Sequence, residues 1–150
     1  MKFVDTLKNR RMIEVFLVVV SISIICVILF PALIKIFNYS LKSSAEDNTD
    51  SALHFTKQLY ATLSIYDDVP LPFRVEFKED GYTIYSNNIE YKPTTPLTVE
   101  SKRKLPKTGI VEIDINGMVT AKEIKFKLGN YVCSQFDGSK PLCVKQQNSL

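Results

Sequence analysis

The stretch that decides the fold covers residues 12–37 and reads MIEVFLVVVSISIICVILFPALIKIF. Its central part, residues 15–34, holds twenty residues without a charged side chain, most of them Val, Ile, Leu and Phe. A helix of twenty residues is about 30 Å long, which matches the hydrocarbon thickness of a bilayer. The sequence therefore predicts one membrane-spanning helix over residues 12–37.

Two residues interrupt this apolar stretch: Glu14 near its start and Pro31 seventeen positions later. A carboxylate in hydrocarbon is unfavourable unless it has a partner. Arg10 and Arg11 precede Glu14 by four and three residues, so on a helix they share its face and could neutralise it within one chain. Pro31 lacks a backbone donor and crowds the preceding turn, which predicts a kink or a loosened turn.

The string MIEVFLVVV at residues 12–20, with Pro31 after it, resembles the N-terminus of type IV pilins and pseudopilins. In that family a glutamate lies just inside the membrane helix, and many members carry a proline seventeen residues further on. The resemblance implies that Glu14 pairs with the N-terminal amine of a neighbouring subunit, and that the Pro31 region loosens in filaments. We therefore take Glu14, Pro31, Arg10 and Arg11 as candidate assembly residues.

The family's leader peptide normally ends in glycine, and the mature chain begins four residues before the glutamate. Counting back from Glu14 places Asn9 and Arg10 at that junction, and the first glycine of the chain is Gly81. The sequence leaves open whether prepilin peptidase cleaves this chain and exposes an N-terminus for methylation. If the leader stays attached, Arg10 or Arg11 from either chain would replace the missing amine.

The distribution of charge predicts a cytoplasmic N-terminus and an extracytoplasmic C-terminal part. The basic residues before the apolar stretch (Lys2, Lys8, Arg10, Arg11) outnumber those close after it (Lys35, Lys42), and positive charge favours the cytoplasmic side. The apolar run is longer than the 7–15 residues of a typical secretory signal, so we expect it to remain in the cell membrane. The net charge of +3 does not mark the whole chain as a polyanion binder.

These observations divide the 150 residues into four parts. We expect a basic leader over 1–11, a transmembrane helix over 12–37, a polar stretch and amphipathic helix over 38–70, and an extracytoplasmic β-rich part over 71–150. Cys133 and Cys143 lie in that last part, where an oxidising compartment favours a disulfide; two free thiols in a reducing compartment are the alternative. Two cysteines without a nearby histidine do not suggest a metal site, and no cofactor is expected.

Apolar residues recur at helical spacing from Leu53 to Leu63, which predicts an amphipathic helix over residues 50–66. Asp50 or Ser51 would cap its start, and residues 67–70 would stop it. Residues 38–50 form either a helical continuation or a linker.

Period-two alternation then predicts a sheet. The expected strands cover residues 73–78, 82–85, 91–101 (an edge strand or loop with two prolines), 110–115, 118–128, 131–135 and 142–145. A helix followed by antiparallel strands defines the α+β class.

The hairpin around Asn116 and Gly117 allows a prediction of register. A two-residue loop would place Ile115 opposite Met118 and mix the two faces, whereas a three-residue loop places Ile115 opposite Val119 and Ile113 opposite Ala121. Because register follows the buried face, we favour the longer loop with a glycine bulge. A change in apolar phase predicts a second bulge near residues 122–123.

No catalytic, phosphate-binding or metal-binding motif is present, so we expect a protein that is not an enzyme and has no small-molecule substrate. The string LPKTG at residues 105–109 matches a sortase signal, but an alternating strand follows it, which favours a turn. The basic loop of residues 102–104 with Lys107 could contact nucleic acid or lipid headgroups; a solvated loop is the preferred interpretation.

Residues 77–82 and 113–119 are similar to the heads of minor pseudopilins of type II secretion and competence systems. The resemblance implies a subunit of a short type IV pilus-like filament for protein secretion or DNA uptake. Its partners would be other pilin-like subunits, a platform membrane protein and an assembly ATPase. The alternative is a single-span membrane protein whose extracytoplasmic β-rich domain binds something unrelated to pili.

Overall fold

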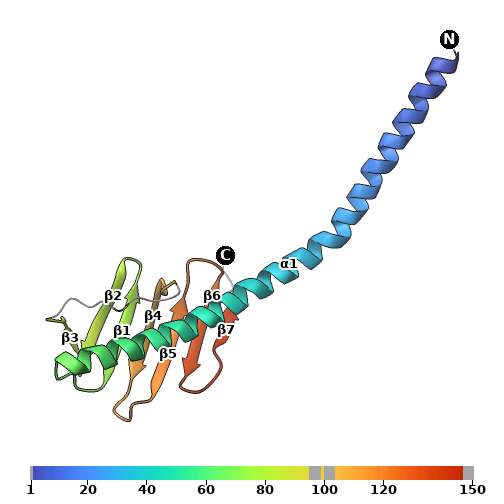
Figure 1. Cartoon of the computed structure of the whole chain (residues 1–150). Helices are drawn as coiled ribbons and strands as arrows, with labels where there is room; N and C mark the ends of the chain where they lie inside the picture. Colours follow the sequence, from blue (N-terminus) through green and yellow to red (C-terminus); the bar gives the residue numbers. More distant parts are fainter. Residues whose placement is uncertain (1, 95–98, 100–103, 147–150) are drawn as a thin grey trace. The chain divides into compact units, whose positions relative to one another are not determined.

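In the part of the chain that the structure describes, one continuous helix, α1 (Lys2–Tyr66), is followed by seven strands that form one antiparallel sheet (Figure 1). This computed structural model describes residues 2–94, 99 and 104–146, with side chains from residue 9 onward. The chain divides into two compact units, Met1–Tyr39 and Ser40–Leu150. The α+β class predicted from the sequence is confirmed.

The first unit consists of the N-terminal part of α1. All side chains from residue 9 to residue 37 are exposed, and Pro31 lies inside the helix without ending it. This part of α1 is long and apolar enough to cross a membrane.

The helix does not restart at residue 50, so the predicted N-terminal cap at Asp50 or Ser51 is wrong. Residues 38–50 remain helical because their inward side is packed: Ala45 is 3% exposed and Thr49 is fully buried. Asp50 instead accepts a hydrogen bond from Gln135 Nε2 at 2.9 Å. The predicted stop is confirmed, since α1 ends at Tyr66.

The core of the second unit lies between α1 and one face of the sheet. Each buried helical residue lies three or four positions from another member of the set, as an amphipathic face requires: Ala45, Thr49, Ala52, Leu53, Phe55, Thr56, Leu59 and Leu63. Thr49 and Thr56 donate their hydroxyls to the carbonyls four residues earlier, which removes the penalty for burying them. Phe55 meets the ring of Tyr82 edge-on, with 5.3 Å between centroids.

The strand order across the sheet is β3-β2-β1-β4-β5-β6-β7. The bounds are β1 Phe73–Lys78, β2 Gly81–Ser86, β3 Ile89–Tyr91, β4 Thr108–Ile113, β5 Val119–Lys125, β6 Tyr131–Phe136 and β7 Leu142–Lys145. The strands predicted at 73–78, 82–85, 131–135 and 142–145 are confirmed.

The strand predicted over residues 91–101 is placed differently. Strand β3 ends at Tyr91, where the prediction began, and pairs only three residues with β2. Residues 92–94 are not strand, and residues 95–98 and 100–101 lie outside the described part of the chain. Pro93 comes two residues after Tyr91 and has no amide hydrogen for a ladder, which accounts for the early end.

Both registers considered for the β4–β5 hairpin are wrong. Ile113 pairs with Val119, and the turn covers residues 114–118. Asp114 builds this wider turn, because its Oδ1 accepts hydrogen bonds from the backbone N–H of Asn116 at 2.8 Å and of Met118 at 2.9 Å. The pairing moves by two residues along β4, so the predicted buried face is kept.

The second bulge is confirmed. The β5–β6 register shifts between Ala121 and Ile124, and Glu123 has a φ of 52°. The extra residue keeps both Ala121 and Ile124 in the core, where they are 2% and 0% exposed. The disulfide between Cys133 and Cys143, which joins β6 to β7, is also confirmed.

Candidate functional site

The candidate site in the first unit is the exposed apolar surface of α1. From Met12 to Phe37, every large hydrophobic side chain is at least one-third exposed, and Val27 reaches 74%. Soluble proteins rarely expose contiguous apolar patches of more than a few hundred Å². A surface that is apolar around the whole helix is typical of a segment surrounded by lipid or by other apolar helices.

The hydroxyl groups inside this stretch are satisfied by the helix itself. Ser21 Oγ donates to the Leu17 carbonyl and Ser23 Oγ to the Val19 carbonyl, each at 2.8 Å. Such bonds remove the need for water around these side chains. These two serines are therefore compatible with a hydrocarbon environment.

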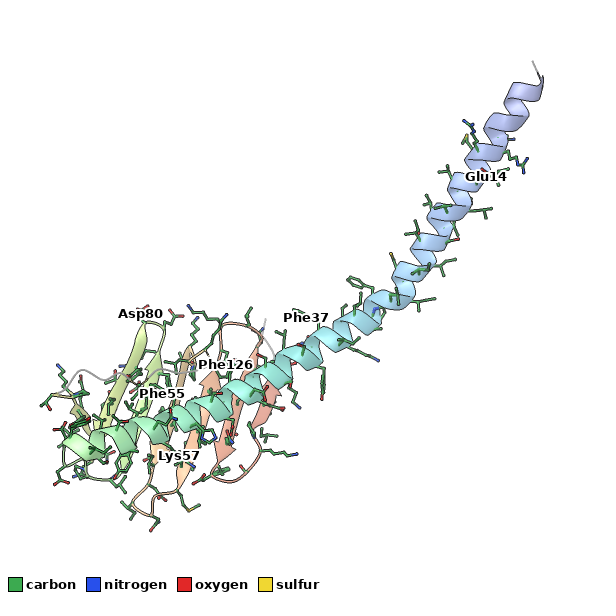
Figure 2. All side chains as sticks on the ribbon, in the orientation of Figure 1. Glu14, Phe37, Phe55, Lys57, Asp80 and Phe126 are labelled. Atoms are coloured by element: carbon green, nitrogen blue, oxygen red, sulfur yellow. A yellow bond between two sulfur atoms is a disulfide. The ribbon has the colours of Figure 1, made fainter. Side chains whose placement is uncertain are left out.

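Glu14 lies on this helix (Figure 2), and the structure brings it together with Arg10. Arg10 Nε lies 3.6 Å from Glu14 Oε1, and the two side chains are 79% and 65% exposed. Arg11 is exposed on the same helix, and Pro31 lies further along it. Cys26, inside the apolar stretch, is a free and exposed thiol.

In the second unit, an ion pair joins α1 to the turn between β6 and β7. Lys57 Nζ donates to Asp137 Oδ1 at 2.8 Å. This hydrogen bond and the lysine charge lower the pKa of the Asp137 carboxyl below its usual value. The pair therefore links the helix to the C-terminal hairpin most strongly when Asp137 is ionised.

A second polar contact joins the end of α1 to β3. The Tyr91 hydroxyl donates to Asp67 Oδ2, and this hydrogen bond raises the pKa of Tyr91 to about 12. These contacts hold the helix on the sheet. Among the described residues, no group of three His, Cys, Asp or Glu side chains could hold a metal ion.

The sequence did not predict a groove that the structure shows in the second unit. It is lined by part of α1, the β1–β2 turn, residues 104–107 and residues 126–128. The lining lysines come from three separate segments of the chain, so a motif along the sequence could not reveal them. Of the predicted basic loop, Lys104 and Lys107 line this groove, whereas Lys102 and Arg103 lie outside the described residues.

Comparison with family models, curated proteins and solved structures gives no match to this chain. The long apolar N-terminal helix followed by an antiparallel sheet is compatible with a pilin-like fold. The chain has, among its described residues, one helix near the N-terminus that is long and apolar enough to span a membrane.

Proposed function

We propose that this protein is a minor pseudopilin-like subunit. It is anchored in the cell membrane by α1, with its N-terminus in the cytoplasm and its β-rich part outside. It assembles through this helix into a short type IV pilus-like filament that serves protein secretion or DNA uptake. Its partners would be other pilin-like subunits, a platform membrane protein and an assembly ATPase, and we propose no catalytic activity.

The observation that supports this proposal is a carboxylate at the entrance of an entirely exposed apolar helix. The side chains of residues 9–37 are all exposed in the isolated chain. An apolar helix in lipid gains little from hydrophobic burial, so specific association depends on packing and on polar pairs. Glu14 is the one acidic residue between Arg11 and Phe37 and thus the group that can fix one helix against another.

The pairing of Glu14 within the chain leaves room for a second partner. The separation of 3.6 Å from Arg10 Nε is longer than the roughly 2.7–2.9 Å of a strong charge-assisted hydrogen bond. Exposed pairs of this kind contribute about 0–1 kcal/mol in water. A neighbouring chain's N-terminal amine, Arg10 or Arg11 would gain more from this carboxylate at the lipid boundary, where charges are poorly solvated.

Crosslinking through the native Cys26 tests the proposal. The chain has three cysteines, two of which form the disulfide, so Cys26 provides one reactive thiol in the membrane helix. The experiment uses full-length protein in membranes together with its genomic neighbours. A series that combines Cys26→Ser with one new cysteine at each position from 22 to 25 and from 27 to 29 covers the other helix faces.

We expect Glu14→Ala and Glu14→Gln to reduce crosslinking to pilin-like partners severalfold. Glu46→Ala is the matched control, because Glu46 pairs with Lys42 at the same i,i+4 spacing and a similar distance of 3.7 Å, but lies in the second unit. Membrane extraction checks that each variant is inserted. Undiminished crosslinking in both Glu14 variants across the whole series would remove the assembly role of this residue.

A second candidate function is that of a single-span membrane protein whose extracytoplasmic β-rich domain binds something unrelated to pili. The Arg10–Glu14 contact favours it, because a carboxylate neutralised within its own chain requires no neighbour. Mass spectrometry of the mature N-terminus helps to separate the two. A chain shortened to begin near Arg10, with a methylated amine, supports the pseudopilin, whereas an intact leader and no crosslinking support the second candidate.

A further inference from the structure

The groove of the second unit has a volume of about 920 Å³ and lies at one end of the sheet. On its helical side it is lined by residues spaced as one helix face: Leu41, Ser44, Ala45 and Asn48. Its other walls are the β1–β2 turn, residues 104–107 and residues 126–128. Figure 2 shows Asp80, which lies in that turn, and Phe126 toward the same ends of the strands, at the top of the sheet in this view.

The rim of this groove is basic. Four lysines line it: Lys78, Lys104, Lys107 and Lys127. The acidic residue among its lining residues is Glu79, which is engaged in an ion pair with Lys107. Lys78, Lys104 and Lys127 are exposed. The groove therefore offers a net positive surface to an anion.

The floor of the groove is apolar. Leu41, Leu105 and Phe126 are partly buried and pack against the core, and Pro106 is buried. Leu128 stands at the mouth of the groove with 66% of its surface exposed. A basic rim over an apolar floor is complementary to a molecule that combines an anionic group with an apolar part.

The chain itself keeps this groove close to a bilayer surface. Leu41 follows Phe37, at the end of the apolar stretch, by four residues. Four residues span at most about 14 Å, whatever conformation they adopt. The polar headgroup layer is about 5–8 Å thick on each side of the hydrocarbon, so Leu41 lies within this layer or no more than about 6–9 Å beyond it.

We propose that this groove binds the headgroup of an anionic phospholipid. The lysines of the rim contact the phosphate and other anionic oxygens, and Leu105, Phe126 and Leu128 contact the glycerol and the upper acyl chain. The occupant is a lipid of the surrounding bilayer. The inference depends on the membrane span and not on filament assembly, so a failure of the assembly proposal would leave it unaffected.

The absence of tryptophan from the chain permits a direct measurement. Leu128→Trp places one reporter, the groove reporter, at the mouth of the groove. Ile115→Trp is the matched control, because Ile115 is similarly exposed at 73% but lies in the turn at the opposite end of the β4–β5 hairpin. The six residues of β4 put at least about 15 Å between the two ends of the hairpin.

Each full-length variant is reconstituted into phosphatidylcholine nanodiscs with a trace of lipid that carries a headgroup nitroxide. The nitroxide is attached to phosphatidylglycerol in one sample and to phosphatidylcholine in the other. We expect labelled phosphatidylglycerol to quench the groove reporter several times more strongly than labelled phosphatidylcholine. The control reporter of Ile115→Trp should show no such preference, and about 1 M salt should abolish the preference of the groove reporter.

Charge reversal then tests whether a lysine of the rim causes the preference for the anionic lipid. In the Leu128→Trp background, Lys127→Glu should lower the preference for phosphatidylglycerol by about fivefold or more, as expected for a lysine near an anionic surface. Lys140→Glu makes the same change of charge beyond the far end of β6 and should leave the preference unchanged. Ser44→Trp is a second reporter on the helical wall and keeps the test valid if Leu128→Trp disturbs folding.

Three results would each overturn the proposal. The first is equal quenching of the reporters of Leu128→Trp and Ser44→Trp by the two labelled lipids. The second is an equal loss of preference in Lys127→Glu and Lys140→Glu, which would indicate only the overall charge. The third is emission from the groove reporter that depends on protein concentration and not on lipid charge, which would assign the groove to an acidic segment of a neighbouring chain.

Discussion

Gly109, near the start of β4, should tolerate no side chain. A β carbon added there would lie 2.6 Å from Ile124 Cδ1, 2.8 Å from Ile124 Cα and 3.0 Å from the Glu123 carbonyl oxygen. Two of these three atoms belong to the backbone of the β5 bulge, and Ile124 is completely buried. The φ of Gly109 is +137°, a conformation that L-residues rarely adopt.

The positive φ and the steric overlap of the added β carbon both lower the stability of Gly109→Ala. Backbone strain in a region restricted to glycine amounts to about 1–3 kcal/mol. Overlap with a packed core adds about 1–3 kcal/mol. We therefore expect the free energy of unfolding to fall by about 2–6 kcal/mol, a large part of the roughly 5–15 kcal/mol that stabilises a typical domain.

Gly117→Ala is the matched control. Gly117 also has a positive φ, +80°, but a β carbon there would meet nothing within 4 Å. Only the conformational penalty remains, which is about 1–2 kcal/mol. The difference between the two variants contains the contact with the bulge together with the larger backbone strain at a φ of +137°.

The assay is urea unfolding of the full chain in nanodiscs, followed by near-UV circular dichroism of its seven tyrosines. With a slope of about 1–3 kcal/mol per molar urea, a loss of about 3 kcal/mol moves the midpoint down by about 1–3 M. A midpoint for Gly109→Ala no lower than that of Gly117→Ala would refute the close approach of β4 to the bulge.

Three further predictions use the same assay. Replacing Cys133 and Cys143 with serine should lower stability by about 3 kcal/mol, because the disulfide closes a loop with a separation of 10 residues; an unchanged midpoint would contradict this. Asp114→Ala should lower stability by about 1–2 kcal/mol, since two backbone N–H groups of the turn lose their acceptor. An unchanged midpoint would show that this carboxylate does not stabilise the turn. Lys57 lowers the pKa of Asp137 from 3.8, so the stability gained from the ionised form is present above about pH 4 and is lost as the pH falls through the lowered value. Asp137→Asn should therefore be less stable than the wild type at about pH 7 and equally stable at low pH, and a difference independent of pH would exclude this linkage.

Local sequence patterns predicted the parts of the fold that depend on local chemistry. The apolar run around Glu14 predicted the long exposed helix, and strict alternation in residues 73–78 predicted β1. The bulge near Glu123 was also predictable, because a residue must be skipped for both Ala121 and Ile124 to reach the core. In each case the pattern of apolar residues reports the local environment, either a helix that is apolar on all sides or a strand with a single buried face.

The register of the β4–β5 hairpin could not be predicted from the apolar pattern of the sequence. Burial restricts register only to steps of two residues, so the choice between equivalent pairings depended on the hydrogen bonds that Asp114 makes with its own turn. The cap predicted at Asp50 failed because packing against the sheet keeps the preceding residues helical.

The sequence by itself determined that this chain has an apolar helix able to span a membrane, an acidic residue at its entrance, an α+β arrangement and a pair of cysteines suited to a disulfide. These features follow from local patterns in the sequence: the length of an apolar run, the period at which apolar residues recur and the positions of single residues. Only the tertiary structure decided the continuity of α1, the register of the hairpin, the requirement for glycine at position 109 and the basic groove. The continuity of α1, the close approach at Gly109 and the groove depend on residues that are distant in sequence and come together only in the folded chain, as Lys78, Lys104 and Lys127 do around one groove. The register depends on hydrogen bonds within the turn at Asp114, which the apolar pattern alone does not select.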